Sequence, residues 1–427
     1  MKTCHLTGGR IVALGCAALT VLAVSACGSQ SQPQSGGDRQ AGSAPLAFTS
    51  GVPIGGAPAE SHNRQAQQLP AVLEGTTAYL AGTAQVRLVD AGNGREIATV
   101  RPTRPVLRPD DPAGATQAPV IADVNGVRSV LWPFLVRSGN GVAMELASIN
   151  AGNHQVATTL VTLPDWASGA AFDLIADPVG AANGTVVINL VGGLYHGVLA
   201  VDAASGKTRW YRDGVTAGAV TGDVVQAVQP MVPPATTDEA IGLAVADGAQ
   251  RWASLRGHGL TVQPAGPHLV AAHGQLPDSS GADTFQLLNA TTGASVTNLA
   301  LNGELPSRCV FDQVASVVCT APADDGGGSR MMIGVDATTG HPVWSKPDGG
   351  SGTLPVPDAT AAWRGVVYAR GSDSMTTAYA AATGFPLLTS NGPTPLVVND
   401  HAALSVGAVS NQVMADRPAP RSTDQQR

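Results

Sequence analysis

Short runs of alternating hydrophobic and polar residues recur along the chain, separated by glycine-rich turns. A typical run, Gly197–Val201, places every second side chain on one face, as a half-buried β-strand does. Asp202 follows it, then a turn that reaches Gly206 and a second run that contains Trp210. The pattern predicts a β-hairpin in which Asp202 accepts backbone N–H groups and Gly206 adopts a positive φ.

This hairpin recurs in seven copies, and from Gly206 onward the turn glycines are 42, 45, 47 and 44 residues apart. The predicted turn residues are Asp90, Gly94, Asp202, Gly206, Gly248, Asn289, Gly293, Asp336, Gly340 and Gly384. Two copies depart from the pattern, because the 150–153 turn is one residue short and the 244–248 turn lacks its opening Asp. A regular spacing of this size is typical of propellers and other repeat architectures.

Tryptophan follows the turn glycine by four residues in three copies, at Trp210, Trp252 and Trp344. A side chain that recurs at one structural offset is expected to pack between neighbouring sheets, where its large ring buries much apolar surface. The alternative is that these rings stack on a ligand. The recurrence favours packing.

Two more β-rich runs precede each hairpin, for example 184–189 and 365–369, so each repeat predicts four short antiparallel strands. One such sheet would expose two apolar faces, and radial stacking of sheets covers them. We therefore predict an all-β fold, a β-propeller of four-stranded antiparallel blades. Seven repeats can be counted. Further strand-like runs after Gly384, with a strand from residues 45–56, would complete an eighth blade, so eight is preferred and seven is the alternative.

The consensus Asp-Ala-x-Thr-Gly-x-x-x-Trp resembles the repeat of PQQ-type, or quinoprotein-like, β-propellers over residues 69–390. Quinoprotein dehydrogenases of this fold carry adjacent cysteines near the cofactor, and this sequence has no Cys-Cys pair. Because function depends on sites and not on folds, neither PQQ nor any other cofactor is expected. The chain also resembles the BamB-type outer-membrane-protein assembly factors, which are lipid-anchored propellers. That resemblance implies protein–protein contacts through loops on one face.

The N-terminus looks like a targeting signal. Lys2 and Arg10 precede an apolar stretch, residues 11–26, that is short for a membrane-spanning helix of about 20 residues. Val24-Ser25-Ala26-Cys27 resembles the bacterial lipobox, which implies a signal peptide of residues 1–26 and a lipid on Cys27. An ordinary secretory signal with an incidental cysteine is the alternative. We expect a protein anchored by lipid to the extracytoplasmic face of the cell membrane.

Composition sets the remaining boundaries. Residues 27–68 are rich in Gln, Ser, Gly and Pro and predict a flexible tether, residues 69–414 the propeller, and residues 415–427 a disordered tail. The net charge is −7, and cleavage after residue 26 would remove two basic residues and no acidic one, leaving −9. An acidic balance argues against a nucleic-acid partner. Only three lysines stand beside 21 arginines, which indicates a GC-rich, actinobacterial genome.

Few residues suggest chemistry. Cys309 and Cys319 flank a predicted hairpin and are expected to form a disulfide in an oxidising compartment, with buried thiols or a redox pair as alternatives. The histidines show no metal-binding spacing, the 323–329 loop resembles a calcium loop only in composition, and no catalytic motif is found. The apolar loop 229–234 could contact a partner.

We therefore predict no catalytic or metal-binding residue and no enzyme. The predicted function is a scaffold that binds an envelope protein in cell-envelope assembly or maintenance. A propeller enzyme or ligand sensor that uses the central channel is the alternative. A scaffold predicts an apolar or charged patch on the loops, whereas an enzyme predicts a deep pocket with clustered, perturbed carboxylates.

Overall fold

The computed structural model describes residues 44–55, 69–108, 117–139, 141–169, 173–231, 237–277, 283–300, 308–322, 330–347, 356–407 and 412–420. The chain divides into two compact units, Met1–Gly42 and Ser43–Arg427, and every described residue belongs to the second. The predicted signal peptide, Cys27, most of the predicted tether and the 323–329 loop lie outside these residues. In the described part, no helix has the length and apolar character needed to cross a membrane.

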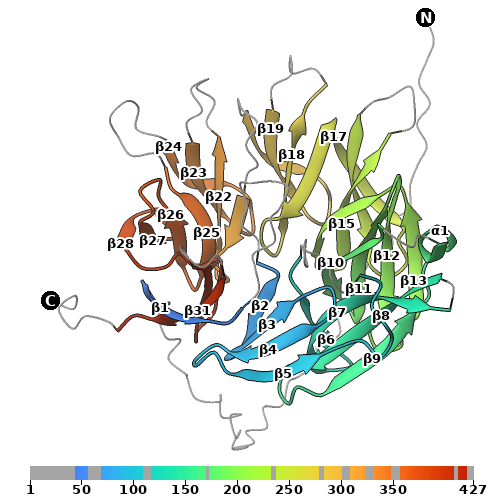
Figure 1. The fold of residues 1–427 in the computed structure, drawn as a ribbon. Helices are drawn as coiled ribbons and strands as arrows, with labels where there is room; N and C mark the ends of the chain where they lie inside the picture. Colours follow the sequence, from blue (N-terminus) through green and yellow to red (C-terminus); the bar gives the residue numbers. More distant parts are fainter. Residues whose placement is uncertain are drawn as a thin grey trace, which may run out of the picture. The chain divides into compact units, whose positions relative to one another are not determined.

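Short antiparallel strands account for nearly all of the described secondary structure (Figure 1). The first sheet contains β2 (Ala71–Glu74), β3 (Thr77–Ala81), β4 (Val86–Asp90) and β5 (Glu96–Val100). The second contains β6 (Val120–Val124), β7 (Val127–Ser138), β8 (Gly141–Asn150) and β9 (Val156–Val161). The third contains β10 (Ile175–Ala182), β11 (Thr185–Gly192), β12 (Tyr195–Asp202) and β13 (Thr208–Asp213). A short helix, α1 (Asp165–Gly169), precedes β10.

The middle of the chain forms one seven-stranded sheet. Its strands are β14 (Thr216–Thr221), β15 (Val224–Pro230), β16 (Asp238–Ala244), β17 (Gln250–Pro264), β18 (Leu269–Gln275), β19 (Asp283–Asn289) and β20 (Ser295–Ala300). β17 pairs with β16 up to Gly257 and with β18 from His258 onward, so it belongs to two successive four-stranded repeats. Whether the blades number eight or seven stays a prediction.

Two more four-stranded sheets follow. One contains β21 (Arg308–Phe311), β22 (Ser316–Pro322), β23 (Arg330–Asp336) and β24 (Pro342–Pro347). The other contains β25 (Asp358–Trp363), β26 (Val366–Arg370), β27 (Thr376–Ala380) and β28 (Pro386–Ser390). Cys309 and Cys319 are direct cross-strand partners in β21 and β22, and a disulfide joins them, which matches the predicted pairing.

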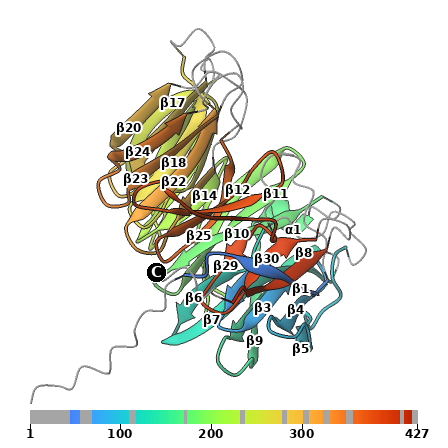
Figure 2. The ribbon, with the colours of Figure 1, turned by 90° about the vertical axis from the view of Figure 1, so that its left-hand side faces the viewer.

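Both ends of the domain build the last sheet. It contains β29 (Val397–Val398), β30 (Ala403–Val406), β31 (Val413–Pro418) and, at its edge, β1 (Phe48–Pro53). Phe48 lies opposite Pro418, and Figure 2 shows β1 together with β29 and β30. The strand expected within residues 45–56 is therefore present.

The predicted domain limits at residues 69 and 414 were too narrow, because β1 lies inside the predicted tether and β31 continues into the predicted tail. At the C-terminal limit, the polar residue Asp416 suggested a solvated tail, but it lies in β31 between two other strands and is buried.

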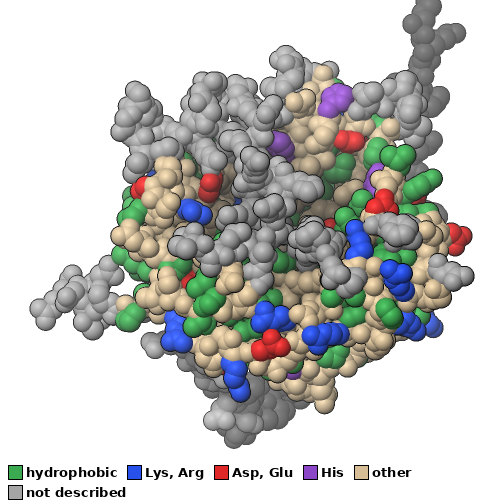
Figure 3. All heavy atoms as spheres, viewed as in Figure 1, with side chains coloured by type: hydrophobic (Ala, Val, Ile, Leu, Met, Phe, Trp, Pro, Cys, Tyr) green, Lys and Arg blue, Asp and Glu red, His purple; other side chains and the backbone are tan. Residues whose placement is uncertain are grey.

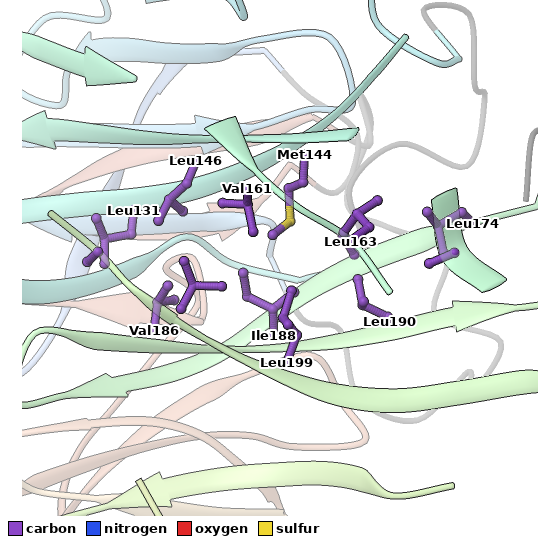
Figure 4. Close-up of a cluster of buried hydrophobic side chains, with 14 of the residues drawn as sticks. Leu131, Met144, Leu146, Val161, Leu163, Leu174, Val186, Ile188, Leu190 and Leu199 are labelled. Carbon is purple, nitrogen blue, oxygen red and sulfur yellow. The ribbon is translucent and has the colours of Figure 1, made fainter. Parts of the chain in front are cut away.

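Hydrophobic clusters lie between consecutive sheets. Leu131 and Met144 of the second sheet pack with Ile188 and Leu199 of the third (Figure 4). Equivalent clusters join the other neighbours, and the last sheet packs both on the β25–β28 sheet and on the first sheet. Four-stranded antiparallel sheets that stack face to face in a closed series form a β-propeller, so the predicted fold class is confirmed.

The two ends of each sheet carry different connections, because neighbouring strands run antiparallel. We call one end the repeat-turn end, since it holds short first-to-second turns and the repeated hairpin turns such as 91–95. The opposite, long-connection end holds the second-to-third connections and the links between sheets, for example the turn at 193–194 between β11 and β12 and the residues 101–108 that follow β5. Both termini of the described domain, at Ala44 and Pro420, adjoin the Phe48–Pro418 pair at the repeat-turn end.

Candidate protein-binding surface

The predicted turn residues close separate hairpins at the repeat-turn end. Asp202 shows the chemistry, because one carboxylate oxygen accepts from the Ser205 N–H at 2.9 Å and hydroxyl at 2.8 Å, and the other accepts from Arg209 at 2.7 Å. The Ser205 hydroxyl, then Arg209, lower the pKa of Asp202 to about 2. Gly206 has a φ of 71° and its N–H donates to the Asp202 carbonyl. Asp90, Asn289 and Asp336 accept comparable backbone bonds in their own turns.

Positive φ also occurs at each of the other predicted turn glycines, Gly94, Gly248, Gly293, Gly340 and Gly384. The 150–153 turn was predicted to be one residue short, and this was wrong. The His154 N–H donates to the Asn150 carbonyl at 2.9 Å, so this turn has the length of the others. His154 itself occupies the left-handed position, with a φ of 61°, where the repeat otherwise has glycine. The 244–248 turn lacks an opening Asp, and the Ala244 carbonyl accepts the Gly248 N–H at 2.9 Å.

The three predicted tryptophans join neighbouring repeats. Trp210 donates its indole N–H to the Val245 carbonyl in the next turn at 2.8 Å. Trp252 and Trp344 donate in the same way to the carbonyls of Ala290 and Ala381. Each ring lies over the turn glycine of the following repeat, and a Cβ on Gly248 would come within 2.8 Å of the Trp210 ring. Packing, rather than ligand stacking, accounts for these contacts.

The carboxylates with shifted pKa values are each held in a local structural contact. Burial alone would raise the pKa of Glu145, but hydrogen bonds from Thr103 and Arg104 bring it below its usual value. The other shifted acids among the described residues lie in different repeats, and they are Glu96, Asp202, Asp223, Asp336 and Asp416. Within the same part of the chain, no three His, Cys, Asp or Glu side chains gather closely enough to hold a metal.

Asp416 lies in β31, between β1 and β30, with 1% of its surface exposed. Its carboxylate accepts from the Gly51 N–H at 3.1 Å and from the Ser405 hydroxyl. Burial raises the pKa of Asp416, and these two hydrogen bonds oppose the rise without cancelling it. Relative to the unfolded chain, folding therefore disfavours the ionised form of this carboxyl.

We predict that Asp416→Asn stabilises the domain at neutral pH. A folded-state pKa above the unfolded value of about 3.9 adds stability below that value, and this contribution is lost as the pH rises through the folded pKa. Asparagine stays neutral and can still accept from Gly51, so the thermal midpoint of the variant should exceed that of the parent at pH 7. The difference should shrink toward pH 4. An identical pH dependence of the two midpoints would contradict this, and Asp123→Asn, at an exposed position, is the control.

An exposed apolar surface lies at the long-connection end of the third sheet. The β11–β12 hairpin places Leu194 at its tip with 97% of its surface exposed, and Tyr195 beside it with 61% exposed. The Tyr195 ring stacks on Trp166 of α1, with centroids 5.8 Å apart and planes 25° apart. Ile175 and Val191 are cross-strand partners and are also exposed.

We call this the aromatic hairpin surface, and it comprises Trp166, Ile175, Val191, Leu194 and Tyr195. Figure 3 shows hydrophobic side chains gathered near α1 at the right-hand side of the view.

A hydrogen-bond chain fixes the base of this surface. Trp166 donates its indole N–H to the Tyr211 hydroxyl at 2.7 Å, and that hydroxyl donates to a carboxylate oxygen of Asp213 at 2.8 Å. Burial, together with the bond to Asp213, raises the pKa of Tyr211 to about 12, so the phenol keeps its proton over the whole physiological range. The hydrogen bond to Tyr211 thus fixes the orientation of the Trp166 indole, and the Tyr195 ring stacks on that indole. A preorganised aromatic pair of this kind is typical of protein-binding sites.

The sequence pattern does not predict this surface. The predicted partner contact was the 229–234 loop. Its first two residues end β15, and residues 232–234 lie outside the described residues. Thr237 donates to the Met231 sulfur at 3.4 Å. The available signal was Gly192-Gly193-Leu194-Tyr195, in which two large apolar residues follow a glycine pair at a turn. Large side chains at a hairpin tip have no sheet to cover them, and contiguous exposed apolar residues mark interaction sites.

No protein-family model matches the sequence, and no curated protein matches it. Among solved structures, BamB from Moraxella catarrhalis is 14% identical, with 89% of this chain and 99% of that chain covered and a TM-score of 0.48. A quinohemoprotein alcohol dehydrogenase from Comamonas testosteroni is 13% identical, with 88% and 77% covered and a TM-score of 0.49. A computationally designed protein, Ika8, is 14% identical, with 85% of this chain and 100% of that chain covered and a TM-score of 0.46. These likenesses concern the fold alone.

One feature of the quinoprotein dehydrogenases, a pair of adjacent cysteines near the cofactor, is absent from this sequence. Cys309 and Cys319 are committed to a disulfide across a hairpin. Moreover, a Cβ added at Gly180 of β10 would come within 2.8 Å of Val220 in β14, so first strands of successive repeats pack in close contact there.

Proposed function

We propose that the protein is a lipid-anchored, extracytoplasmic scaffold that binds an envelope protein through the aromatic hairpin surface, in cell-envelope assembly or maintenance. The observation that carries this proposal is the exposure of Leu194 and Tyr195 at the tip of a hairpin whose base is rigidly held. Exposing large apolar side chains to water is unfavourable, and a partner that covers them would recover the free energy of burial.

Two further observations support the proposed location of the protein outside the cytoplasm. The lipobox-like residues before Cys27 predict export and lipidation, and the Cys309–Cys319 disulfide is typical of proteins in oxidising compartments. The chain enters the described domain at the repeat-turn end, whereas the aromatic hairpin surface lies at the long-connection end.

Site-specific crosslinking in the native envelope tests the proposal. A photo-crosslinking amino acid replaces Leu194 in one variant and Phe385 in another, because Phe385 is also exposed, at 70%, but follows the repeat turn at Gly384. We expect a discrete crosslinked adduct from position 194 and none of the same mass from position 385. Addition of Tyr195→Ser to the first variant should reduce that adduct by about tenfold or more, as loss of an aromatic anchor does. Equal adducts from both positions would contradict the proposal.

A further inference from the structure

The charges around the aromatic hairpin surface are predominantly negative. Asp165 precedes Trp166 in α1, and Asp213 accepts from the Tyr211 hydroxyl beneath that indole. Asp173 lies at the hairpin, because a Cβ on Gly193 would come within 3.2 Å of its carboxylate. All three carboxylate-bearing residues are exposed. None of them forms an ion pair with any residue that the structure describes.

Two cations lie close in the sequence or structure to this rim, Arg108 and Arg212. Arg108 donates to the Leu174 carbonyl at 2.6 Å, so its positive charge lies near Asp173 and offsets part of the negative charge of the three carboxylates. Arg212 lies between Tyr211 and Asp213 in β13, and alternation along a strand directs its side chain to the other face. By contrast, Arg209, Arg251 and Arg256 each pair with an acid elsewhere in the described domain.

Aromatic faces and carboxylates attract the same kind of group. The faces of Trp and Tyr rings carry negative potential and bind guanidinium and ammonium groups, and unpaired carboxylates bind them by ion pairing. The exposed Leu194 and the Ile175–Val191 pair add an apolar area next to these groups. Neutral apolar or acidic partners would leave the three carboxylates without compensation.

We infer that the aromatic hairpin surface binds a basic segment of its partner protein, in which an arginine or lysine side chain stacks on the Trp166–Tyr195 pair and flanking apolar residues cover Leu194. This inference rests on the proposed scaffold function and assigns the chemistry of its partner. The cation would lie among Asp165, Asp173 and Asp213. Electrostatic attraction of this kind also raises association rates and weakens with salt.

A peptide pair tests the assignment on the full-length, lipid-bearing protein in detergent. The probe is a fluorescent peptide that alternates arginine with leucine, and its matched control has citrulline, a neutral isostere, in place of every arginine. We expect the arginine peptide to bind about tenfold more tightly by fluorescence anisotropy, because exposed cation–π contacts and ion pairs each change an affinity by about two- to fivefold. Its affinity should also fall as salt is raised from about 50 to about 500 mM, since salt screens exposed charges.

Substitutions distinguish the contribution of the carboxylates to peptide binding from that of the apolar contact. Asp165→Asn and Asp173→Asn should each weaken the arginine peptide about threefold and leave the citrulline peptide unchanged, whereas Leu194→Ser should weaken both. Asp123→Asn, on the exposed part of β6, is the matched control and should weaken neither. Equal binding of the two peptides, or no binding of the arginine peptide at millimolar concentration, overturns the assignment of a basic partner. Crosslinking from position 194 would persist in that case, and its absence would instead contradict the scaffold function.

Discussion

Replacing Cys27 by serine should abolish lipid attachment to the protein. In bacterial lipoproteins the sulfur atom of the lipobox cysteine receives the diacylglyceryl group. Val24–Cys27 resembles that lipobox, and a serine hydroxyl does not replace the cysteine thiol in this reaction. Each buried CH₂ group of an acyl chain contributes about 0.8 kcal/mol, so loss of several chains removes an anchor that is effectively permanent. Metabolic labelling with an alkyne palmitate should label the parent and leave the Cys27→Ser variant unlabelled.

Membrane release needs a second step, because an uncleaved apolar signal would itself hold the variant at the membrane. We therefore expect release into the soluble extracytoplasmic fraction when Cys27→Ser is combined with an ordinary cleavable secretory signal in place of residues 1–26. Cys16→Ser is the matched control, since this cysteine lies before the predicted cleavage position and should leave labelling unchanged. Labelling that survives Cys27→Ser, or that is lost in Cys16→Ser, would contradict lipidation at Cys27.

The features that the sequence predicted correctly depend on local chemistry. A hairpin turn needs a residue with a positive φ and a side chain that accepts backbone N–H groups, so Asp202 and Gly206 reveal it within five residues. The pairing of Cys309 with Cys319 follows in the same way from two strands joined by a short turn. Because these patterns repeat, the chain also discloses how its sheets stack, and the fold class follows.

One of the two features that it missed depends on neighbours that are distant in the sequence. His154 takes a left-handed conformation that favours glycine, and its ring packs edge-on to Tyr79, 6.4 Å away in the preceding sheet. Asp416 looks like part of a polar tail until the pairing of β31 with β1, more than 300 residues away, buries it. The burial of Asp416 is set by tertiary contacts that no local pattern contains, whereas the turn at His154 is closed by the local bond to Asn150 and was missed because the position lacks the usual glycine.

The binding surface was missed for a related reason. Leu194 follows the buried strand β11 and Tyr195 begins the buried strand β12, so their apolar character looks continuous with the core. The exposure of Leu194 and Tyr195 depends on where this sheet ends relative to the neighbouring sheets. Trp166, which stacks on Tyr195, belongs to a connection nearly 30 residues earlier in the chain. The conjunction becomes visible only when the hairpin and α1 are placed together.

Trp210→Ala should destabilise the domain by about 3–5 kcal/mol, the usual cost of deleting a large buried aromatic side chain. The ring is 8% exposed, lies over Gly248 of the next repeat and donates to the Val245 carbonyl. Trp210→Phe should cost less, about 1–3 kcal/mol, because an aromatic ring is kept and that buried carbonyl loses its donor. Equilibrium unfolding in urea, with unchanged slopes, measures both losses. If Trp210 served to stack on a ligand, either substitution would leave the free energy of unfolding nearly unchanged.

A double-mutant cycle with Gly248 tests whether the two repeats are joined through this contact. Gly248→Ala alone should be costly for two reasons, since Gly248 has a φ of 72° and its new Cβ would come within 2.8 Å of the Trp210 ring. Gly126→Ala isolates the first reason, because Gly126 has a φ of 77° and a Cβ added there would have no neighbouring atom within 4 Å. In the Trp210→Ala background the cost of Gly248→Ala should fall toward that of Gly126→Ala, giving a coupling of about 0.5–3 kcal/mol. Strict additivity would show that the tryptophan does not join one repeat to the next.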